Sequence, residues 1–338
     1  MPQISVILPT CNRAPTVAEA VQSVLAQTWT DFEVVVVDDG STDDTEGRIS
    51  RLEDPRIRII RQERSERCVA RNRGIHASWG EYVSFLDDDD RYAPRKLEQQ
   101  LLFLRAHPEV DFVGSGFFAG EGFRVVQQPW RHGDGKDDIT LQDCLYGIRP
   151  AMWTCLVRRT ALDKMDHWFD TRLIPIEDID FVLRLALACG SRGKWLRECV
   201  YFYTRDIYRN AQVILSAHHD WQNVLDKLYA RPDLPADVIA QHARVYLWQD
   251  VHIACTAYMA GMTDLARFVL MKSLALRPEL MEAGPELVAE FLTRLTLSNP
   301  EQKAACQRAA EVIFDHLPPL LSRCWAHGRA QALARIGP

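Results

Sequence analysis

Short apolar segments alternate with segments of helical period along the first part of the chain. The apolar runs are rich in β-branched residues and too short for buried helices: Ile4–Leu8, Phe32–Val37, Arg56–Ile60 and Glu81–Leu86. Ala14–Thr28 and Cys68–Ser78 have a helical period, and Ser41 with Asp44 three residues on predicts a capped helix start. Strands that alternate with helices predict a mostly parallel, doubly wound α/β sheet flanked by helices.

A segment rich in glycine and polar residues, Phe117–Pro150, interrupts this alternation. Gly114, Gly116 and Ala119 match the G-x-G-x-x-A spacing of a dinucleotide motif, but that motif opens a helix. Because FFAGEGFRVV continues with strand-forming residues, we predict two strands and a turn there instead. Beyond this segment we predict two more strands and an amphipathic helix: Ala151–Arg159, Lys194–Tyr203 and Phe181–Ala188.

The pattern becomes entirely helical from about Ile214. The helical segments are Trp221–Tyr229, Asp237–Met259, Met262–Leu276, Pro285–Leu297 and Glu301–His316. No segment recurs at a fixed spacing, so the pattern does not indicate a repeat array. We therefore predict two domains, an α/β domain over residues 1–213 and an all-helical region over residues 214–338.

Composition indicates an ordinary globular protein and excludes some partners. Of 338 residues, 47% are hydrophobic and 25% charged, and the net charge of −6 argues against nucleic-acid binding. The nine cysteines lack C-x-x-C spacing, and the N-terminus does not resemble a signal peptide. We expect a cytoplasmic protein. The basic segment Leu317–Pro338 either docks on an anionic membrane surface or on a partner, or packs as a terminal helix. We favour the terminal helix.

Acidic clusters follow two of the predicted strands. Asp38 and Asp39 end one strand, and Asp87–Asp90 follow another. The carboxyl ends of parallel strands meet at one edge of a sheet, where ligands bind. The acids either cap helices or hold a divalent cation, which takes carboxylate and phosphate oxygens. A nucleotide diphosphate bound through a metal fits both clusters, although the P-loop motif is missing.

Successive motifs carry a family resemblance. ISVILPTCNR, FEVVVVDDGSTDDT, ARNRGIHASWGEYVSFLDDDD with YAPRKLEQQ, and IEDIDFVLRL resemble, in order and spacing, the motifs of family 2 glycosyltransferases with the GT-A fold. The resemblance covers roughly the first 210 residues. It implies a nucleotide-diphospho-sugar donor, Mn²⁺ or Mg²⁺, and inversion at the anomeric carbon.

The resemblance also assigns residues to the nucleotide. It implies a first nucleotide-contacting loop formed by Pro9, Thr10 and Arg13. Asp39 matches the aspartate that contacts the uracil edge, with Asp38 beside it. Arg71 is similar to a basic residue near the nucleotide, and Arg67 is a nearby substitute. These matches favour UDP as the nucleotide.

Further matches concern the metal and the chemistry. Asp87 and Asp89 match the two acids of the family's D-x-D motif, of which the second ligates the metal. Asp88 and Asp90 make the motif more acidic, and we group Asp87 and Asp88 with the donor contacts as well. Asp178 matches the family's catalytic base; the alternative is an acid that only decorates a helix N-terminus.

The predicted function is metal-dependent inverting transfer from a UDP-sugar to a hydroxyl of a glycan, lipid-linked or other acceptor. Phe117–Pro150 is the expected acceptor side, and three tryptophans are either sugar platforms or core: Trp130, Trp153 and Trp168. One alternative is a sugar nucleotidylyltransferase, although PTCNRAPT lacks the required glycines and lysine. The other is a binding or scaffold protein without transferase activity.

Overall fold

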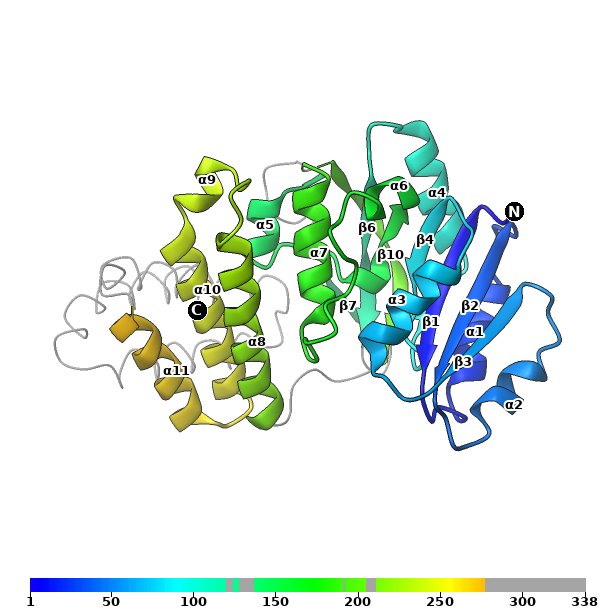
Figure 1. The fold of residues 1–338 in the computed structure, drawn as a ribbon, viewed down its shortest axis with the longest axis horizontal. Helices are drawn as coiled ribbons and strands as arrows, with labels where there is room; N and C mark the ends of the chain where they lie inside the picture. Colours follow the sequence, from blue (N-terminus) through cyan, green and yellow to red (C-terminus); the bar gives the residue numbers. More distant parts are fainter. Residues whose placement is uncertain (120–123, 128–136, 191, 205–210, 277–338) are drawn as a thin grey trace. The chain divides into compact units, whose positions relative to one another are not determined.

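The computed structural model describes residues 1–119, 124–127, 137–190, 192–204 and 211–276 (Figure 1). The chain divides into two compact units, Met1–Arg205 and Asp206–Pro338. The first unit contains a mixed sheet with flanking helices, and the described part of the second is helical. The predicted fold class is therefore confirmed.

Four parallel strands form one half of the sheet. They lie in the order β3 (Ile57–Gln62), β2 (Phe32–Asp39), β1 (Ile4–Thr10) and β4 (Tyr82–Phe85). The helices between them are α1 (Val17–Leu25), α2 (Thr45–Ser50) and α3 (Arg67–Ala77). Every residue of β1, β2 and β4 is buried, which explains why apolar residues dominate these strands.

The other half of the sheet is mixed. β9 (Leu156–Arg158) pairs antiparallel with both β4 and β6 (Phe112–Ala119), and β6 runs parallel to β10 (Gly193–Tyr203). Shorter strands complete it: β5 (Arg91–Tyr92), β7 (Arg124–Gln127) and β8 (Asp138–Ile139). β6 and β7 pair antiparallel, which confirms the predicted strand pair and rules out the dinucleotide motif.

Two local predictions were wrong. The helix expected from Ser41 begins at Thr45, because the Ser41 hydroxyl instead accepts a hydrogen bond from the backbone N of Asn12 at 2.9 Å. The strand expected over Ala151–Arg159 is a short 3₁₀ helix, η2 (Met152–Thr154), followed by β9. The remaining helices of this unit are α4 (Lys96–Ala106), α5 (Leu141–Leu145), α6 (Arg159–Leu162) and α7 (Glu177–Ala188).

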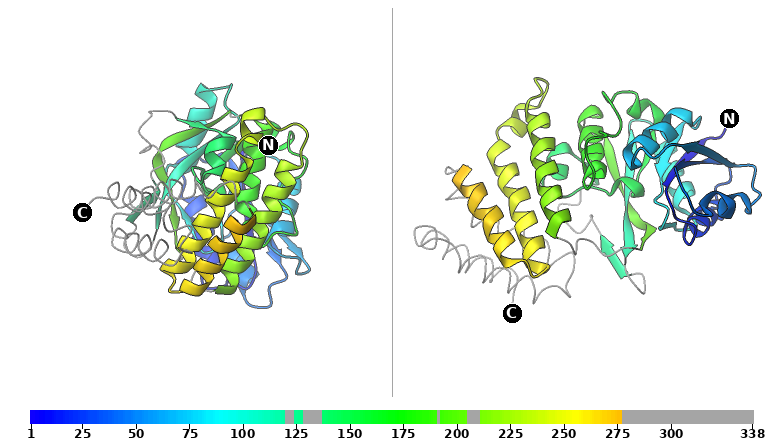
Figure 2. Two further views of the ribbon diagram at one scale, coloured as in Figure 1. Left: turned by 90° about the vertical axis from the view of Figure 1, so that its left-hand side faces the viewer. Right: turned by 60° about the horizontal axis from the view of Figure 1, so that its bottom comes forward.

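The described part of the second unit consists of α8 (Ala211–Tyr229), α9 (Ala236–Ile239), α10 (His242–Met259) and α11 (Thr263–Leu276). Figure 2 shows α8, α10 and α11 side by side, and α10 packs against both of the others. Among the residues described, no helix is long and apolar enough to cross a membrane. The predicted helices Pro285–Leu297 and Glu301–His316 and the basic segment Leu317–Pro338 lie outside the described residues.

Candidate functional site

A pocket lies at the carboxyl ends of β1, β2 and β4 and against the first turn of α3. Its volume is about 260 Å³. Its lining residues are Pro9, Thr10, Cys11, Arg13, Asp39, Arg64, Glu66, Arg67, Ala70, Arg71, Asp87, Asp88 and Asp89. The two acidic clusters therefore meet at one edge, as expected. The lining contains arginines but no lysine, so it lacks the lysine that the nucleotidylyltransferase alternative requires.

Asp39 organises one wall of the pocket. Its carboxylate accepts hydrogen bonds from Gln62 Nε2 at 2.7 Å and from the backbone N of Ser65 and Glu66 at 2.8 and 2.9 Å. Glu66 has φ 72°, a backbone conformation that non-glycine residues rarely adopt. Gly40 is also left-handed, and an added Cβ would lie 2.9 Å from the backbone N of Arg64. The loop after β3 is thus held closely against Asp39.

Asp38 takes no part in this wall. It is fully buried, does not line the pocket, and accepts a hydrogen bond from the backbone N of Ser41 at 2.9 Å. Neighbouring residues of a strand point to opposite faces, so Asp38 and Asp39 face different surroundings. The structure therefore does not support the expectation that Asp38 contacts a nucleotide.

The four consecutive aspartates have two distinct roles. Asp87, Asp88 and Asp89 line the pocket, and Arg13 lies 3.3 Å from Asp88 and 3.6 Å from Asp89. Burial raises the pKa of Asp88 to about 6, although Thr10 and Arg13 oppose that rise. The local charge is therefore only partly balanced by protein groups.

Asp90 is a supporting residue. Its carboxylate accepts hydrogen bonds from the hydroxyl of Tyr201 at 2.9 Å and from the backbone N of Thr204 at 2.8 Å. Burial, reinforced by Asp87, raises the pKa of Asp90 to about 7. Because Asp90 is buried and does not line the pocket, it holds the end of β10 against the acidic segment.

The pocket fits a divalent cation that is shared with a phosphate ligand. Its wall carries three adjacent carboxylates, yet the described residues contain no cluster of three ligating side chains able to hold a metal alone. Mg²⁺ and similar ions are commonly held by one or two carboxylates together with substrate phosphates. Arg71 Nε is a buried donor with no partner among the residues described, as expected beside a ligand rich in acceptors.

Arg71 joins the acidic segment to the start of α7. Its guanidinium donates to Asp87 Oδ1 at 2.7 Å and to Glu177 Oε1 at 2.8 Å. Arg67 lies 2.9 Å from the same Glu177 oxygen, and the Arg71 guanidinium lies over the ring of Phe169 at 5.4 Å. Burial disfavours the charged form of Arg71 and so lowers its pKa. The carboxylates of Asp87 and Glu177 have the larger, opposite effect, and the pKa of Arg71 is raised. Arg71 is therefore a buried cation that both carboxylates stabilise.

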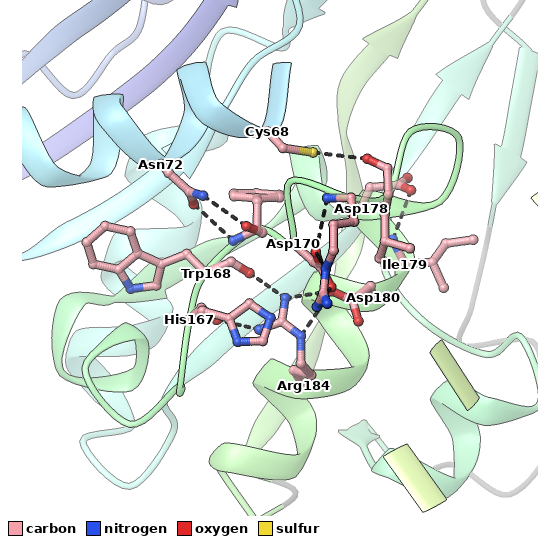
Figure 3. A network of polar contacts seen from close by, with 12 residues as sticks. Cys68, Asn72, His167, Trp168, Asp170, Asp178, Ile179, Asp180 and Arg184 are labelled. Atoms are coloured by element: carbon pink, nitrogen blue, oxygen red, sulfur yellow. Dashed lines mark hydrogen bonds and ion pairs between the residues drawn. The ribbon is translucent and has the colours of Figure 1, made fainter. Parts of the chain in front are cut away.

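Asp178 follows Glu177 in the first turn of α7 and is partly exposed. Figure 3 shows it near Asp180, whose carboxylate pairs with Arg184 one turn along the helix at 2.6 Å. Arg184 also donates to the carbonyls of His167 and Trp168, which fixes this turn to the preceding loop. Burial raises the pKa of Asp178, an effect that nearby arginines oppose.

The three tryptophans predicted to be either sugar platforms or core residues lie in different surroundings. Trp153 is 7% exposed and stacks inside an aromatic cluster, so it is core and not a surface platform. Trp168 donates from its indole to the carbonyl of Leu162 at 3.3 Å. Trp130 lies outside the described residues.

Among the charged residues that line the pocket, sequence reasoning missed two, Arg64 and Glu66. Both lie in the loop that follows β3, at the same edge of the sheet as the acidic clusters. The position of this loop could have been predicted from the sequence, because β3 was predicted as the next parallel strand. It was overlooked because the loop contains no acidic run.

Comparisons with known proteins agree with this arrangement. The family model described as Glycosyl transferase family 2 matches residues 5–165. WcaA of Escherichia coli strain K12, named as a colanic acid biosynthesis glycosyl transferase, is 38% identical over 205 residues, which are 57% of this chain and 69% of WcaA. The uncharacterised glycosyltransferase EpsJ of Bacillus subtilis is 31% identical, and the match covers 60% of this chain and 61% of EpsJ. The chain thus spans only part of some relatives, and 24% of one from Rickettsia felis.

Solved structures share the fold. TarS residues 1–349 of S. aureus, crystallised in complex with UDP, has a TM-score of 0.61 at 20% identity, covering 98% of this chain and 89% of TarS. The mannosyltransferase PcManGT of Pyrobaculum calidifontis, in complex with GDP-Man and Mn²⁺, has a TM-score of 0.56 at 18% identity, covering 99% and 86% of the two chains.

We predict that Arg71→Met lowers the free energy of unfolding by about 3–5 kcal/mol, because it leaves buried Glu177 with less compensation. Chemical denaturation followed by circular dichroism measures this loss. Arg64→Met is the matched control: its side chain is 59% exposed in the same pocket, so we expect a change of about 0.5 kcal/mol or less.

Glu177→Gln in the Arg71→Met background should restore part of the lost stability, since it removes the buried charge. Equal losses in Arg71→Met and Arg64→Met would contradict the buried-link account.

Proposed function

Because the chain belongs to glycosyltransferase family 2, we propose that it transfers a sugar from a nucleotide diphosphate to an acceptor hydroxyl, with inversion at the anomeric carbon. The observation that carries this proposal is the Arg71 link, which joins Asp87 of the pocket to Glu177, the neighbour of Asp178. A donor pocket and a separate carboxylate are the two groups that a single displacement requires.

The donor's nucleotide occupies the pocket between the Asp39 wall and the acidic segment. Arg13, Arg64 and Arg67 contribute cationic side chains to the lining, which suits a diphosphate. Asp39 accepts from a donor group of the base, and UDP is the favoured nucleotide. The names of the fold neighbours include UDP for TarS and GDP-Man for PcManGT, so both nucleotides belong in the first binding screen.

Asp87 and Asp89 would hold a divalent cation, Mn²⁺ or Mg²⁺, together with the donor's phosphates. When bound, such a cation neutralises the charge that develops on the departing nucleotide diphosphate. Arg13, close to Asp88 and Asp89, holds the acidic segment together before the donor arrives. Asp90 keeps its supporting role.

Asp178 is the general base. The acceptor hydroxyl gives its proton to Asp178 as its oxygen forms a bond to the sugar's anomeric carbon. The bond from that carbon to the phosphate oxygen breaks at the same time, and the nucleotide diphosphate leaves with the electron pair. A carboxylate whose pKa is raised by burial is a better base than an ordinary one, provided that it remains ionised.

The proposed acceptor is a glycan or a lipid-linked saccharide. The proposed setting is the cytoplasm, where nine cysteines without disulfide spacing remain reduced, with peripheral contact at the inner face of the membrane. The helical region 214–338 is proposed to bind the acceptor, a partner or the membrane surface.

We predict that UDP or GDP stabilises the protein much more with Mn²⁺ than with EDTA. Adjacent carboxylates repel a diphosphate unless a cation is shared between them. Thermal unfolding measures the effect, because a ligand that binds only the native state raises the melting temperature. Asp89→Asn should remove most of the difference between Mn²⁺ and EDTA.

Asp90→Asn is the matched control for this experiment. Asp90 is buried and hydrogen-bonded away from the pocket, so the variant should unfold at a lower temperature yet keep its metal-dependent shift. Equal stabilisation of the wild type with Mn²⁺ and with EDTA would rule out the metal role.

Asp178→Asn should lower the turnover number by roughly 10²–10⁴-fold, the usual cost of losing a general base. Nucleotide affinity should stay near that of the wild type, since Asp178 does not line the pocket. Because burial raises its pKa, the acid limb of the rate profile should lie above the ordinary aspartate value of about 3.9. Steady-state kinetics and calorimetry measure the two effects.

Asp180→Asn provides the control in the same helical turn. Asp180 pairs with Arg184, so this variant should lose stability while its turnover stays within a few-fold of the wild type. A fully active Asp178→Asn enzyme would end the assignment of the base. Glu177→Gln should have a milder effect on turnover than Asp178→Asn.

A further inference from the structure

The end of β10 is fixed against the acidic segment by residues on both sides of Tyr203. Tyr201 donates to Asp90 at 2.9 Å and accepts from the backbone N of Asp87 at 3.3 Å. On the other side, the backbone N of Thr204 donates to Asp90 at 2.8 Å. Tyr201 and Tyr203 lie two residues apart on one strand, so they share a face of the sheet. Tyr203 is therefore held next to the proposed reaction centre.

The ring of Tyr203 is held in one orientation by an aromatic cluster. Trp153 stacks on it with ring centroids 5.2 Å apart and an interplanar angle of 5°. The ring of Phe117 meets Trp153 edge-on at 4.8 Å and lies 6.0 Å from Tyr203. Trp153 is buried, whereas Tyr203 is partly exposed. Tyr203 thus offers ligands a rigid aromatic ring that Trp153 itself does not offer.

The hydroxyl of Tyr203 is available to hydrogen-bond a ligand, unlike the hydroxyl of Tyr201. Within the described part of the chain it has no hydrogen-bond partner, although the Tyr201 hydroxyl has two. Burial raises the pKa of Tyr203, and so do the carboxylates of Asp90, Asp87 and Asp178. A phenol is protonated at neutral pH, so the hydroxyl of Tyr203 can donate a hydrogen bond to a ligand.

Tyr203 does not belong to the nucleotide pocket, because it is missing from the residues that line it. η2, which contains Trp153, packs against both β10 and α7, so Tyr203 lies on the side where Asp178 and the proposed acceptor hydroxyl are placed. One face of a pyranose ring carries mainly C–H groups and its edge carries hydroxyls. An aromatic ring with a free phenol matches both features.

We propose that Tyr203, backed by Trp153, binds a pyranose ring of the acceptor and positions its hydroxyl at Asp178. This inference rests on the proposed transferase function and deepens it, since it assigns a specific residue to the acceptor sugar. Tyr203 is a specificity-determining residue that acts on the acceptor and leaves donor binding unchanged.

The test begins with a panel of p-nitrophenyl hexosides and N-acetylhexosaminides as acceptors. Mass spectrometry measures sugar transfer to each of them from UDP- and GDP-sugars in the presence of Mn²⁺. We expect at least one glycoside to be an acceptor. With that glycoside, Tyr203→Ala should raise the acceptor KM about tenfold or more, and Tyr203→Phe, which keeps the ring, should raise it about threefold. Affinity for the nucleotide sugar and for the free nucleotide should not change in either variant.

Phe202→Leu is the matched control, because Phe202 points to the opposite face of β10 and stacks on Phe118 at 5.2 Å. It should leave the acceptor KM unchanged. Tyr203→Phe keeps the test decisive even if Tyr203→Ala does not fold.

Three results would overturn the inference alone. In the first, the enzyme hydrolyses a nucleotide sugar but uses no glycoside of the panel. In the second, the acceptor KM does not change in the Tyr203 variants. In the third, those variants weaken binding of the nucleotide sugar but not of the free nucleotide, which would assign Tyr203 to the donor sugar. If the wild type neither binds nor hydrolyses any nucleotide sugar, the proposed function fails and this inference fails with it.

Discussion

The buried guanidinium of Arg71 is the interaction on which the candidate site depends. It connects Asp87 to Glu177, which lies 106 residues after Arg71 in the sequence. Removing one carboxylate would leave the buried charge of Arg71 poorly compensated and would lower the free energy of unfolding. Arg71, Asp87 and Glu177 therefore stabilise one another only when all three are present. This link fixes the position of α7, and with it Asp178, relative to the acidic segment. The distance between the pocket and Asp178, the proposed base, is thereby built into the folded core.

A second constraint is the charge balance along the pocket. The lining contains four arginines and five carboxylates, and Arg13 of the first loop lies close to Asp88 and Asp89. Asp90, although adjacent in sequence, is used to fasten β10 through Tyr201. Consecutive residues of one acidic run thus either line the pocket or fasten the scaffold. The proposed cation and diphosphate would together complete this charge balance.

Much of this arrangement was accessible from the sequence, because strand periodicity and acidic strand ends are local signals. That pattern predicted the strands β1, β2 and β4. It also predicted that the acidic ends of β2 and β4 meet at one edge of the sheet. The sequence could not distinguish Asp38 from Asp39, since only the packing of β2 determines which one faces the pocket. Ser41 was misread because its hydroxyl binds the backbone of Asn12, 29 residues away. The available hydroxyl of Tyr203 is likewise a tertiary feature, with no local signal.

The most direct test of the central claim is the anomeric configuration of the first sugar released. Asp178 acting as a base beside the Arg71 link implies one displacement, with the acceptor oxygen entering opposite to the nucleotide diphosphate. Proton NMR can follow the anomeric signal while the enzyme hydrolyses an α-linked nucleotide sugar in the presence of Mn²⁺. The account predicts that the β-sugar appears first and then equilibrates. Initial release of the α-sugar would contradict it.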